Sequence, residues 1–347
     1  MGSRRWAVGG GQLAVGSWRL AVGGLWRAES STGGRLGLFS ANSPPPTANS
    51  QPPTVLSIRD HIRIPVSLGE LHAERYGFGD HPLVLLHGFG TSSFLWRHVV
   101  PALPLGQVTA WALDLLGHGE SDRPTEGEFD IAAQATCVEQ AMTVLRVGRA
   151  TVVGVDLGAA VALRLAATRP ARVHSLVLIS PPAPGRGRGD DLTELGRVAA
   201  LHLFEATRGM FGAAAWLGPL LIKSVSSADA MPPKLVTRYA APFVGADGVR
   251  HLQELANAVS DDDMESLDLA KVTARTLVLR GEKDAWCSAS DATRLATAIR
   301  HAELRTVPSA GRLIPEDAPA ALAALLAEWA PTLRRAERLR EIPKADE

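Results

Sequence analysis

The stretch ATVVGVDLGAAVALRLAATRP, residues 150–170, decides the fold. Its first six residues form an apolar run typical of a parallel strand that is buried on both faces, and the alanine- and leucine-rich text after Asp156 is typical of a buried helix. The small residues Gly154 and Gly158 flank Asp156 and permit the sharp strand-to-helix turn of a nucleophile elbow. We therefore expect Asp156 at the tip of this turn, where the helix N-terminus stabilises a carboxylate. The alternative is that Asp156 only caps the helix.

Outward from this stretch, short apolar runs alternate with helix-like segments. The expected strands cover residues 71–76, 83–86, 108–113, 150–155, 173–179, 276–279 and 303–307, and the expected helices cover 131–145, 157–168 and 318–329. This alternation predicts an α/β fold with a doubly wound, mostly parallel sheet. A helix-like segment rich in glycine, alanine and leucine interrupts this alternation after the strand at 173–179 and predicts an inserted cap. We expect a core in two parts, residues 55–180 and 276–333, a helical cap at 181–275 and a charged tail at 334–347.

Residues 7–27 contain a repeat with a period of seven, AVGGGQL, AVGSWRL and AVGGLWR, and a stretch rich in serine, proline and asparagine follows. Each glycine costs about 1 kcal/mol in a helix relative to alanine, so a heptad helix is disfavoured. We expect residues 1–54 to form a low-complexity extension without regular structure. The arginine-containing, acid-free start leaves two interpretations open, a targeting segment and a start codon assigned too far upstream.

The composition excludes several classes of protein. The formal net charge is zero, with 36 basic and 36 acidic residues, which argues against a nucleic-acid partner. Two cysteines are too few for a disulfide scaffold or a CxxC metal site, and we expect free thiols and a cytoplasmic location. Apolar stretches fall short of the roughly 20 residues of an integral membrane segment. We expect a monomer or homodimer with a small-molecule substrate or ligand, no cofactor and no metal.

A second motif, LVLLHGFG at residues 83–90, predicts a strand followed by a glycine-rich loop. Such a loop exposes backbone N–H groups, so the N–H groups of Phe89 and Leu157 would form a two-donor oxyanion hole. We interpret His87, Gly88 and Gly90 as support for this loop. The next strand exit, DLLGHGESDRP at residues 114–124, contains His118, which we interpret as a loop-bracing residue.

The order and spacing of HGFG, DLLGHGESDRP and GVDLG resemble those of the α/β-hydrolase superfamily over residues 55–331. HGFGTSSFLWR together with an aspartate elbow is similar to the branch that contains haloalkane dehalogenases, fluoroacetate dehalogenases and epoxide hydrolases. In that branch an aspartate attacks carbon, a histidine activates water to hydrolyse the ester, and an acid after a late strand orients the histidine. The resemblance implies that Asp156 is the nucleophile and that Asp284, in TLVLRGEKDAWCS, is the acid. A surface-loop aspartate is the alternative for Asp284.

Arg312, in RTVPSAGRLIPEDAP, occupies the position where this family has its catalytic histidine. Arginine stays protonated and only donates hydrogen bonds, so it cannot act as a general base. Loss of the base reduces the rate by roughly 10²- to 10⁴-fold. The guanidinium could instead pair with Asp156 or Asp284, which would turn a catalytic site into a binding site.

Two hypotheses for the function follow. The first is a hydrolase that acts on a small apolar substrate through Asp156, possible bases being the cap histidines His202 and His251 or the later His301. The second is a catalytically inactive small-molecule-binding protein. Leu157 stands where haloalkane dehalogenases have a halide-binding tryptophan, and the cap contains one tyrosine, Tyr239, where epoxide hydrolases use tyrosines as acids.

Overall fold

The computed structural model describes residues 17–21, 25–29, 35–40, 59–124, 129–182, 212–260 and 262–329. The chain divides into two compact units, Met1–Ser57 and Ile58–Glu347. The first unit contains a three-stranded antiparallel sheet of β1 (Ser17–Ala21), β2 (Leu25–Glu29) and β3 (Arg35–Ser40). These strands differ from the expectation that residues 1–54 lack regular structure. The glycines of the repeat argue against a continuous helix. They do not argue against short strands, and β1 and β2, SWRLA and LWRAE, contain no glycine.

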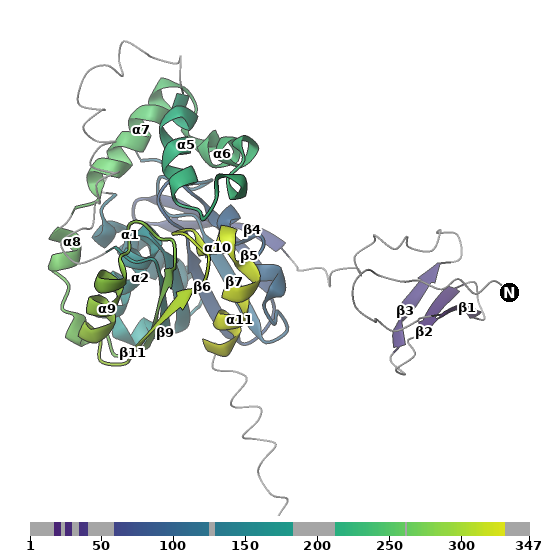
Figure 1. The fold of residues 1–347 in the computed structure, drawn as a ribbon. Coiled ribbons are helices and arrows are strands. Elements are labelled where there is room, and N and C mark those ends of the chain that lie inside the picture. The colour runs from purple at the N-terminus through teal and green to yellow at the C-terminus, as the bar shows by residue number, and fades with distance from the viewer. Residues whose placement is uncertain are drawn as a thin grey trace, which may run out of the picture. The chain divides into compact units, whose positions relative to one another are not determined.

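The second unit is built on an eight-stranded sheet in the order β11-β10-β9-β8-β6-β7-β5-β4, which confirms the predicted mostly parallel α/β fold (Figure 1). The strands are β4 (Arg59–Val66), β5 (Gly69–Gly77), β6 (His81–Leu86), β7 (Val108–Leu113), β8 (Ala150–Val155), β9 (Val173–Ile179), β10 (Arg275–Gly281) and β11 (Ala302–Val307). Strands β6 to β11 are parallel, and β5 is antiparallel to both of its neighbours. The carboxyl ends of β6 to β11 therefore meet at one edge, where ligands bind in open α/β sheets.

The edge strand β4 has no counterpart among the predicted strands. Its sequence, RDHIRIPV, is rich in charge and contains Pro65, which cannot donate to a strand ladder and is tolerated at an edge. β4 pairs with β5 so that His61 lies opposite Glu74 and Arg63 lies opposite His72. Side chains two residues apart share one face of a strand, so this register sets which polar groups of the two strands meet.

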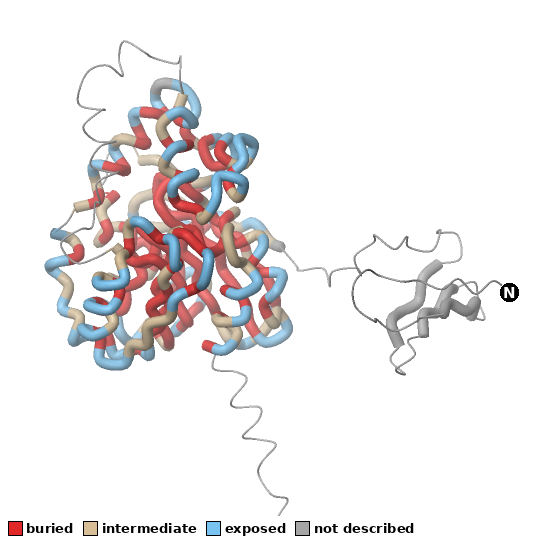
Figure 2. The backbone as a smooth tube through the Cα atoms, in the orientation of Figure 1, coloured by how far each residue is buried: buried red, intermediate tan, exposed pale blue. Residues whose placement is uncertain are grey.

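Helices cover the sheet, whose strands form the buried centre of the unit (Figure 2). The core helices are α1 (Ile131–Val144), α2 (Leu157–Thr168), α9 (Ala289–Ala298), α10 (Ile314–Asp317) and α11 (Pro319–Trp329). Every residue of β7 and β8 is buried, as the apolar runs predict for strands covered on both faces. Cys137 and Cys287 are free and buried.

The helical insert between β9 and β10 contains α5 (Gly212–Lys223), α6 (Pro233–Ala240), α7 (Gly245–Ala258) and α8 (Asp262–Glu265), and Figure 1 shows α5, α6 and α7 grouped together. Short 3-10 helices lie at Ser93–Trp96, Val100–Ala102, Pro170–Arg172, Ala228–Ala230, Ala241–Phe243 and Leu269–Lys271. Residues 183–211 of the predicted cap, His202 among them, lie outside the described residues. No helix in the described ranges is both long enough and apolar enough to cross a membrane.

Candidate active site

Asp156 lies between β8 and α2 in a strained backbone conformation, with φ of 52° and ψ of −114°. Few residues other than glycine adopt such a positive φ, so the chain makes a sharp, strained strand-to-helix turn at this position. A Cβ on Gly158 would lie 2.5 Å from the carbonyl oxygen of His87, and one on Gly154 would lie 2.1 Å from that of Gly158. The turn therefore requires both glycines. Asp156 occupies the N-cap position of α2, but its side chain makes no capping hydrogen bond with the helix.

The glycine-rich loop after β6 brings a backbone donor to this carboxylate. The N–H group of Phe89 donates to Oδ2 of Asp156 at 3.0 Å. A Cβ on Gly88 would lie 3.1 Å from Cβ of Asp156, so the absence of a side chain allows the close approach. Leu157, the other predicted donor, is the first residue of α2, and the N–H groups of a first helical turn have no partner within the helix.

His87 ties this loop to the next one along the sheet edge. Its Nδ1 lies 2.8 Å from the carbonyl oxygen of Gly88, and its Nε2 accepts from the N–H group of Leu115 at 2.9 Å. The ring is fully buried, and this burial lowers its pKa, so it is neutral with the proton on Nδ1. Such contacts belong to a loop-supporting residue. Gly90 has φ of 65°, and a Cβ there would lie 2.3 Å from Cδ1 of Leu217, so α5 packs directly on the loop.

Arg312 lies on the loop after β11 and donates from Nη2 to Oδ1 of Asp156. The two side chains are 12% and 9% exposed, so the ion pair is largely shielded from water. The centre of the guanidinium lies 4.8 Å from the ring centroid of Trp286, within range of a cation–π interaction. Burial lowers the pKa of Arg312 to about 9, which keeps it protonated at neutral pH, and the adjacent carboxylate favours the same state.

Two backbone hydrogen bonds fix the position of Arg312. The N–H group of Gly311 donates to Oδ2 of Asp317 at 2.7 Å, and that of Leu313 donates to the carbonyl oxygen of Ser224 at 2.8 Å. Asp317 also accepts from the N–H and hydroxyl groups of Ser226. The residues on both sides of Arg312 are therefore held, and the guanidinium is directed to Asp156.

Asp284 lies on the loop after β10, and its side chain is only partly hydrogen-bonded. Oδ1 accepts from the N–H groups of Trp286 and Cys287 at 2.8 and 3.0 Å. Oδ2 of Asp284 and the hydroxyl of Ser180, a residue with φ of 48°, are both buried and lie too far apart or misaligned for a well-formed hydrogen bond. The hydroxyl is nevertheless close enough to act against the rise in the pKa of Asp284. Burial raises the pKa of Asp284. Arg312 makes no hydrogen bond with it, so of the two predicted partners only Asp156 receives the guanidinium.

The two cap candidates contact the core rather than Asp156. The hydroxyl of Tyr239 donates to Oε1 of Glu316, which also binds Arg97 at 2.7 Å. Burial, followed by the charge of Glu316, raises the pKa of Tyr239 well above its usual range. Nε2 of His251 lies 2.9 Å from the carbonyl oxygen of Gly117. Both side chains therefore fasten the cap to the core.

The other histidines supply no base among the described residues. His118 is fully buried, and burial is the main cause that lowers its pKa to about 3. Its Nε2 has no hydrogen-bond partner. His301 precedes β11 and lies at the amino end of that strand, away from the carboxyl-end edge. Within residues 59–124, 129–182, 212–260 and 262–329, no imidazole hydrogen-bonds to Asp156 or Asp284.

Sequence reasoning missed Ser180 and Trp286, both of which follow a strand at the same edge of the sheet as Asp156. Trp286 stands two positions after Asp284, within TLVLRGEKDAWCS, so its place in the sequence could have identified it as a site residue. Ser180 directly follows β9, and this position at a strand end gives only a weak indication that it belongs to the site.

This fold and site define a class of protein: the chain belongs to the α/β-hydrolase fold family, whose sequence model matches residues 81–319. The predicted resemblance to this superfamily is confirmed. Its relatives include a dihydrolipoyllysine-residue acetyltransferase component of the acetoin cleaving system of Pseudomonas putida, 33% identical over 70% of this chain and 61% of the relative. This chain thus spans about three fifths of that relative. A haloalkane dehalogenase of Mycobacterium marinum is 27% identical over 72% of this chain and 84% of the dehalogenase.

Solved structures with the same fold include an epoxide hydrolase without ligand. It has a TM-score of 0.69 and 21% identity, over 80% of this chain and 100% of that one. A haloalkane dehalogenase from Bradyrhizobium elkani has a TM-score of 0.67 and 24% identity, over 80% and 99% of the two chains. The structural neighbours share the fold, and the sequence and structural neighbours together include dehalogenases and epoxide hydrolases.

Proposed function

We propose that this chain is an α/β-hydrolase family member that binds a small molecule beside Asp156 without completing its hydrolysis. The ion pair between Arg312 and Asp156 is the observation that carries the proposal. It joins a nucleophile-position carboxylate to a group that cannot accept a proton.

The contacts of Asp156 oppose both halves of a hydrolytic cycle. Oδ2 accepts from Phe89 and Oδ1 accepts from Arg312, so attack on a carbon atom must first disrupt a charge-assisted hydrogen bond. Hydrolysis of the resulting ester needs a base that removes a proton from water. Arg312 offers only donors, and Asp284 orients no imidazole among the described residues.

The same contacts suit the binding of a polar group. Nε of Arg312 is buried and has no partner, so a ligand oxygen at this position would satisfy a donor that is otherwise unpaired. The ring of Trp286 lies against the guanidinium of Arg312, and Phe89 and Leu157, the apolar residues beside Asp156, are buried. We therefore propose a small, largely apolar ligand with one hydrogen-bond acceptor.

A second candidate function is hydrolysis through an aspartate nucleophile, as in dehalogenases and epoxide hydrolases. The strained elbow and the Phe89 N–H group on Asp156 favour it, because both are parts of a working nucleophile site. Leu157 supplies no indole N–H group for a halide, which favours epoxides or esters over haloalkanes as substrates.

Intact-mass spectrometry of the full chain after incubation with panels of haloalkanes, epoxides and esters separates these functions. Product formation without a change in protein mass supports the second candidate and overturns the first. A stoichiometric adduct that is absent from Asp156→Asn shows a nucleophile trapped after the first half of the reaction. An unchanged mass with a ligand-dependent rise in melting temperature supports binding alone. An unchanged mass without any such rise contradicts both functions for the compounds tested.

A further inference from the structure

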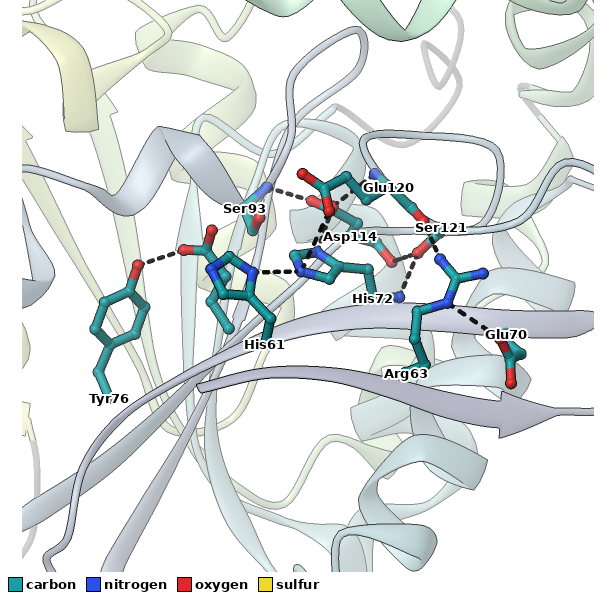
Figure 3. A network of polar contacts seen from close by, with 10 residues as sticks. His61, Arg63, Glu70, His72, Tyr76, Ser93, Asp114, Glu120 and Ser121 are labelled. Atoms are coloured by element: carbon teal, nitrogen blue, oxygen red, sulfur yellow. Dashed lines mark hydrogen bonds and ion pairs between the residues drawn. The ribbon is translucent and has the colours of Figure 1, made fainter. Parts of the chain in front are cut away.

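Two histidines and a glutamate from separate segments meet beside the β4–β5 edge, at a distance along the chain from the Asp156 motif. His61 lies on β4, His72 lies on β5 and Glu120 lies on the loop after β7 (Figure 3). The candidate ligand atoms of all three lie within 4.8 Å of one another. His72 is buried, whereas His61 and Glu120 are exposed, so the cluster is open to solvent on one side.

The two imidazoles are stacked, with ring centroids 5.3 Å apart and ring planes at 26°, and a nitrogen of each ring comes close to the other. Nδ1 of His61 lies 3.0 Å from Nε2 of His72. Two nitrogen ligands at about 2.0 Å from a tetrahedral ion are about 3.3 Å apart, which is close to the observed spacing. A turn of the exposed His61 ring out of the stack would direct its lone pair toward an ion bound to Nε2 of His72. Oε2 of Glu120 lies 3.8 Å from Nε2 of His72 and completes a set of nitrogen and oxygen ligands.

A carboxylate behind His72 orients its ring toward this point. Nδ1 of His72 lies 2.8 Å from Oδ2 of Asp114, and Asp114 is buried. This contact places the proton on Nδ1 and leaves the lone pair of Nε2 free to bind, an arrangement found behind most metal-binding histidines. The N–H group of Glu120 donates to the same oxygen of Asp114 at 2.9 Å. One carboxylate therefore positions two of the three ligands.

The neighbouring charges are compatible with a bound cation. Arg63 lies two residues after His61 on β4, and its guanidinium is paired with Glu70 and Asp122 while it donates to the backbone carbonyl of Glu120. Glu74, opposite His61 on β5, adds a buried carboxyl group that accepts from Tyr76. The guanidinium is thus neutralised by carboxylates and leaves the Glu120 side chain to the histidines.

We propose that His61, His72 and Glu120 form a site for a divalent transition metal, with Zn²⁺ as the best fit and water at the open position. Two imidazoles and one carboxylate are a ligand set that Zn²⁺ accepts, and its remaining position is filled by water. The sequence indicated no metal, because β4 was not recognised and its pairing with β5 was therefore not foreseen. The bound ion would join the edge strands to the loop after β7.

A hydrogen bond between the two rings is the competing explanation. The Nδ1–H group of His61 would donate to Nε2 of His72, and no ion would be needed. The two explanations differ in what Zn²⁺ does, since only a metal site binds it at one equivalent and loses it when Glu120 is neutralised.

The test uses the untagged full chain stripped of metal, with Zn²⁺ titrated by calorimetry. We expect the wild type to bind one equivalent of Zn²⁺. His61→Asn and Glu120→Gln should bind Zn²⁺ at least about tenfold more weakly than the wild type. Both residues are exposed, so the variants should fold, and an unchanged melting temperature without metal checks this. His98→Asn, an exposed histidine elsewhere, is the matched control and should bind as the wild type does.

Co²⁺ gives a second readout, because an ion held by two nitrogen ligands in tetrahedral geometry absorbs visible light strongly. This band should appear with the wild type and with His98→Asn and should be lost with His61→Asn. Zn²⁺ binding that is absent from the wild type, or unchanged in both His61→Asn and Glu120→Gln, would overturn the proposal.

Discussion

Arg312 donates a hydrogen bond to Asp156 and none to Asp284. An imidazole at position 312 would bridge the space between the two loops, because it has one nitrogen for the acid and one for water. The guanidinium reaches only the elbow, so Oδ2 of Asp284 stays buried and unpaired. The consequences of this arrangement for catalysis and for stability can be measured separately.

Substitution of Arg312 by histidine should create or raise turnover. The new imidazole would regain Asp284 as its orienting partner and could accept a proton from water, and a general base contributes about 10²- to 10⁴-fold. Steady-state hydrolysis of epoxide and ester panels measures the gain. Arg312→Lys keeps the charge without supplying a base and should gain nothing.

The same substitution has a second control. In Arg312→His combined with Asp284→Asn, most of the gained rate should disappear, because the imidazole loses the carboxylate that orients it. If Arg312→His folds normally and remains inactive on every substrate, the ligand-contacting part of the site has diverged beyond the missing base.

Neutralisation of Asp156 should destabilise the protein. Asp156→Asn leaves the guanidinium of Arg312 buried without a counter-charge, and the loss of one partner of a buried ion pair costs about 3 kcal/mol. Urea unfolding measures the change in the free energy of unfolding. Arg312→Met should partly rescue Asp156→Asn in the double variant, since both charges are then absent. Additive effects of the two substitutions would show that the pair is not coupled.

The effect of Asp284 on stability should depend on pH. Its folded-state pKa is raised by burial, so its contribution to stability is fully present below the unfolded pKa of 3.8 and is lost as the pH rises through the folded pKa. Asp284→Asn cannot ionise and keeps an oxygen for the N–H groups of Trp286 and Cys287. The variant should therefore gain stability relative to the wild type between about pH 4 and pH 7. If the difference in the free energy of unfolding between Asp284→Asn and the wild type does not change with pH across this range, the raised pKa of Asp284 is contradicted.

The elbow should be intolerant of a methyl group at Gly154. A Cβ there meets the backbone of Gly158 and Ala159 at 2.1 and 2.6 Å, and neither can move without disturbing the first turn of α2. We expect Gly154→Ala to lose about 2–3 kcal/mol of unfolding free energy. Gly148→Ala, where no heavy atom lies within 4 Å, is the matched control and should be nearly neutral.

The sequence predicted the central part of the fold because its strands are long apolar runs with clear ends. β8 and α2 have the expected bounds, and Asp156 sits at their junction, in the sharp turn that GVDLG predicts. Its positive φ is a detail that only the structure gives. β4 was missed because edge strands carry charge and proline, so they lack the pattern that identifies buried strands. The helical cap was recognised as a change in composition, without the helices within it.

The site was predictable as a set of loops and not as a set of contacts. Arg312 was assigned to the histidine position from the text around it, but two carboxylates remained possible partners, and only the loop geometry set by Gly311 and Leu313 selects Asp156. Tyr239 and His251 were candidates because the cap can face the elbow. Their partners, Glu316 and the carbonyl of Gly117, lie far away in sequence and leave no local signature.

Asp114 joins three segments through one buried carboxylate, since it binds His72, the N–H group of Ser93 and the N–H group of Glu120. The contact with His72 spans 42 positions of the chain, and it requires β5 to have joined β7. Contacts between distant positions form slowly, because loop-closure entropy is lost before any contact energy is gained. The loops after β6 and β7 should therefore reach their final conformation late in folding, after β5 has paired with β7.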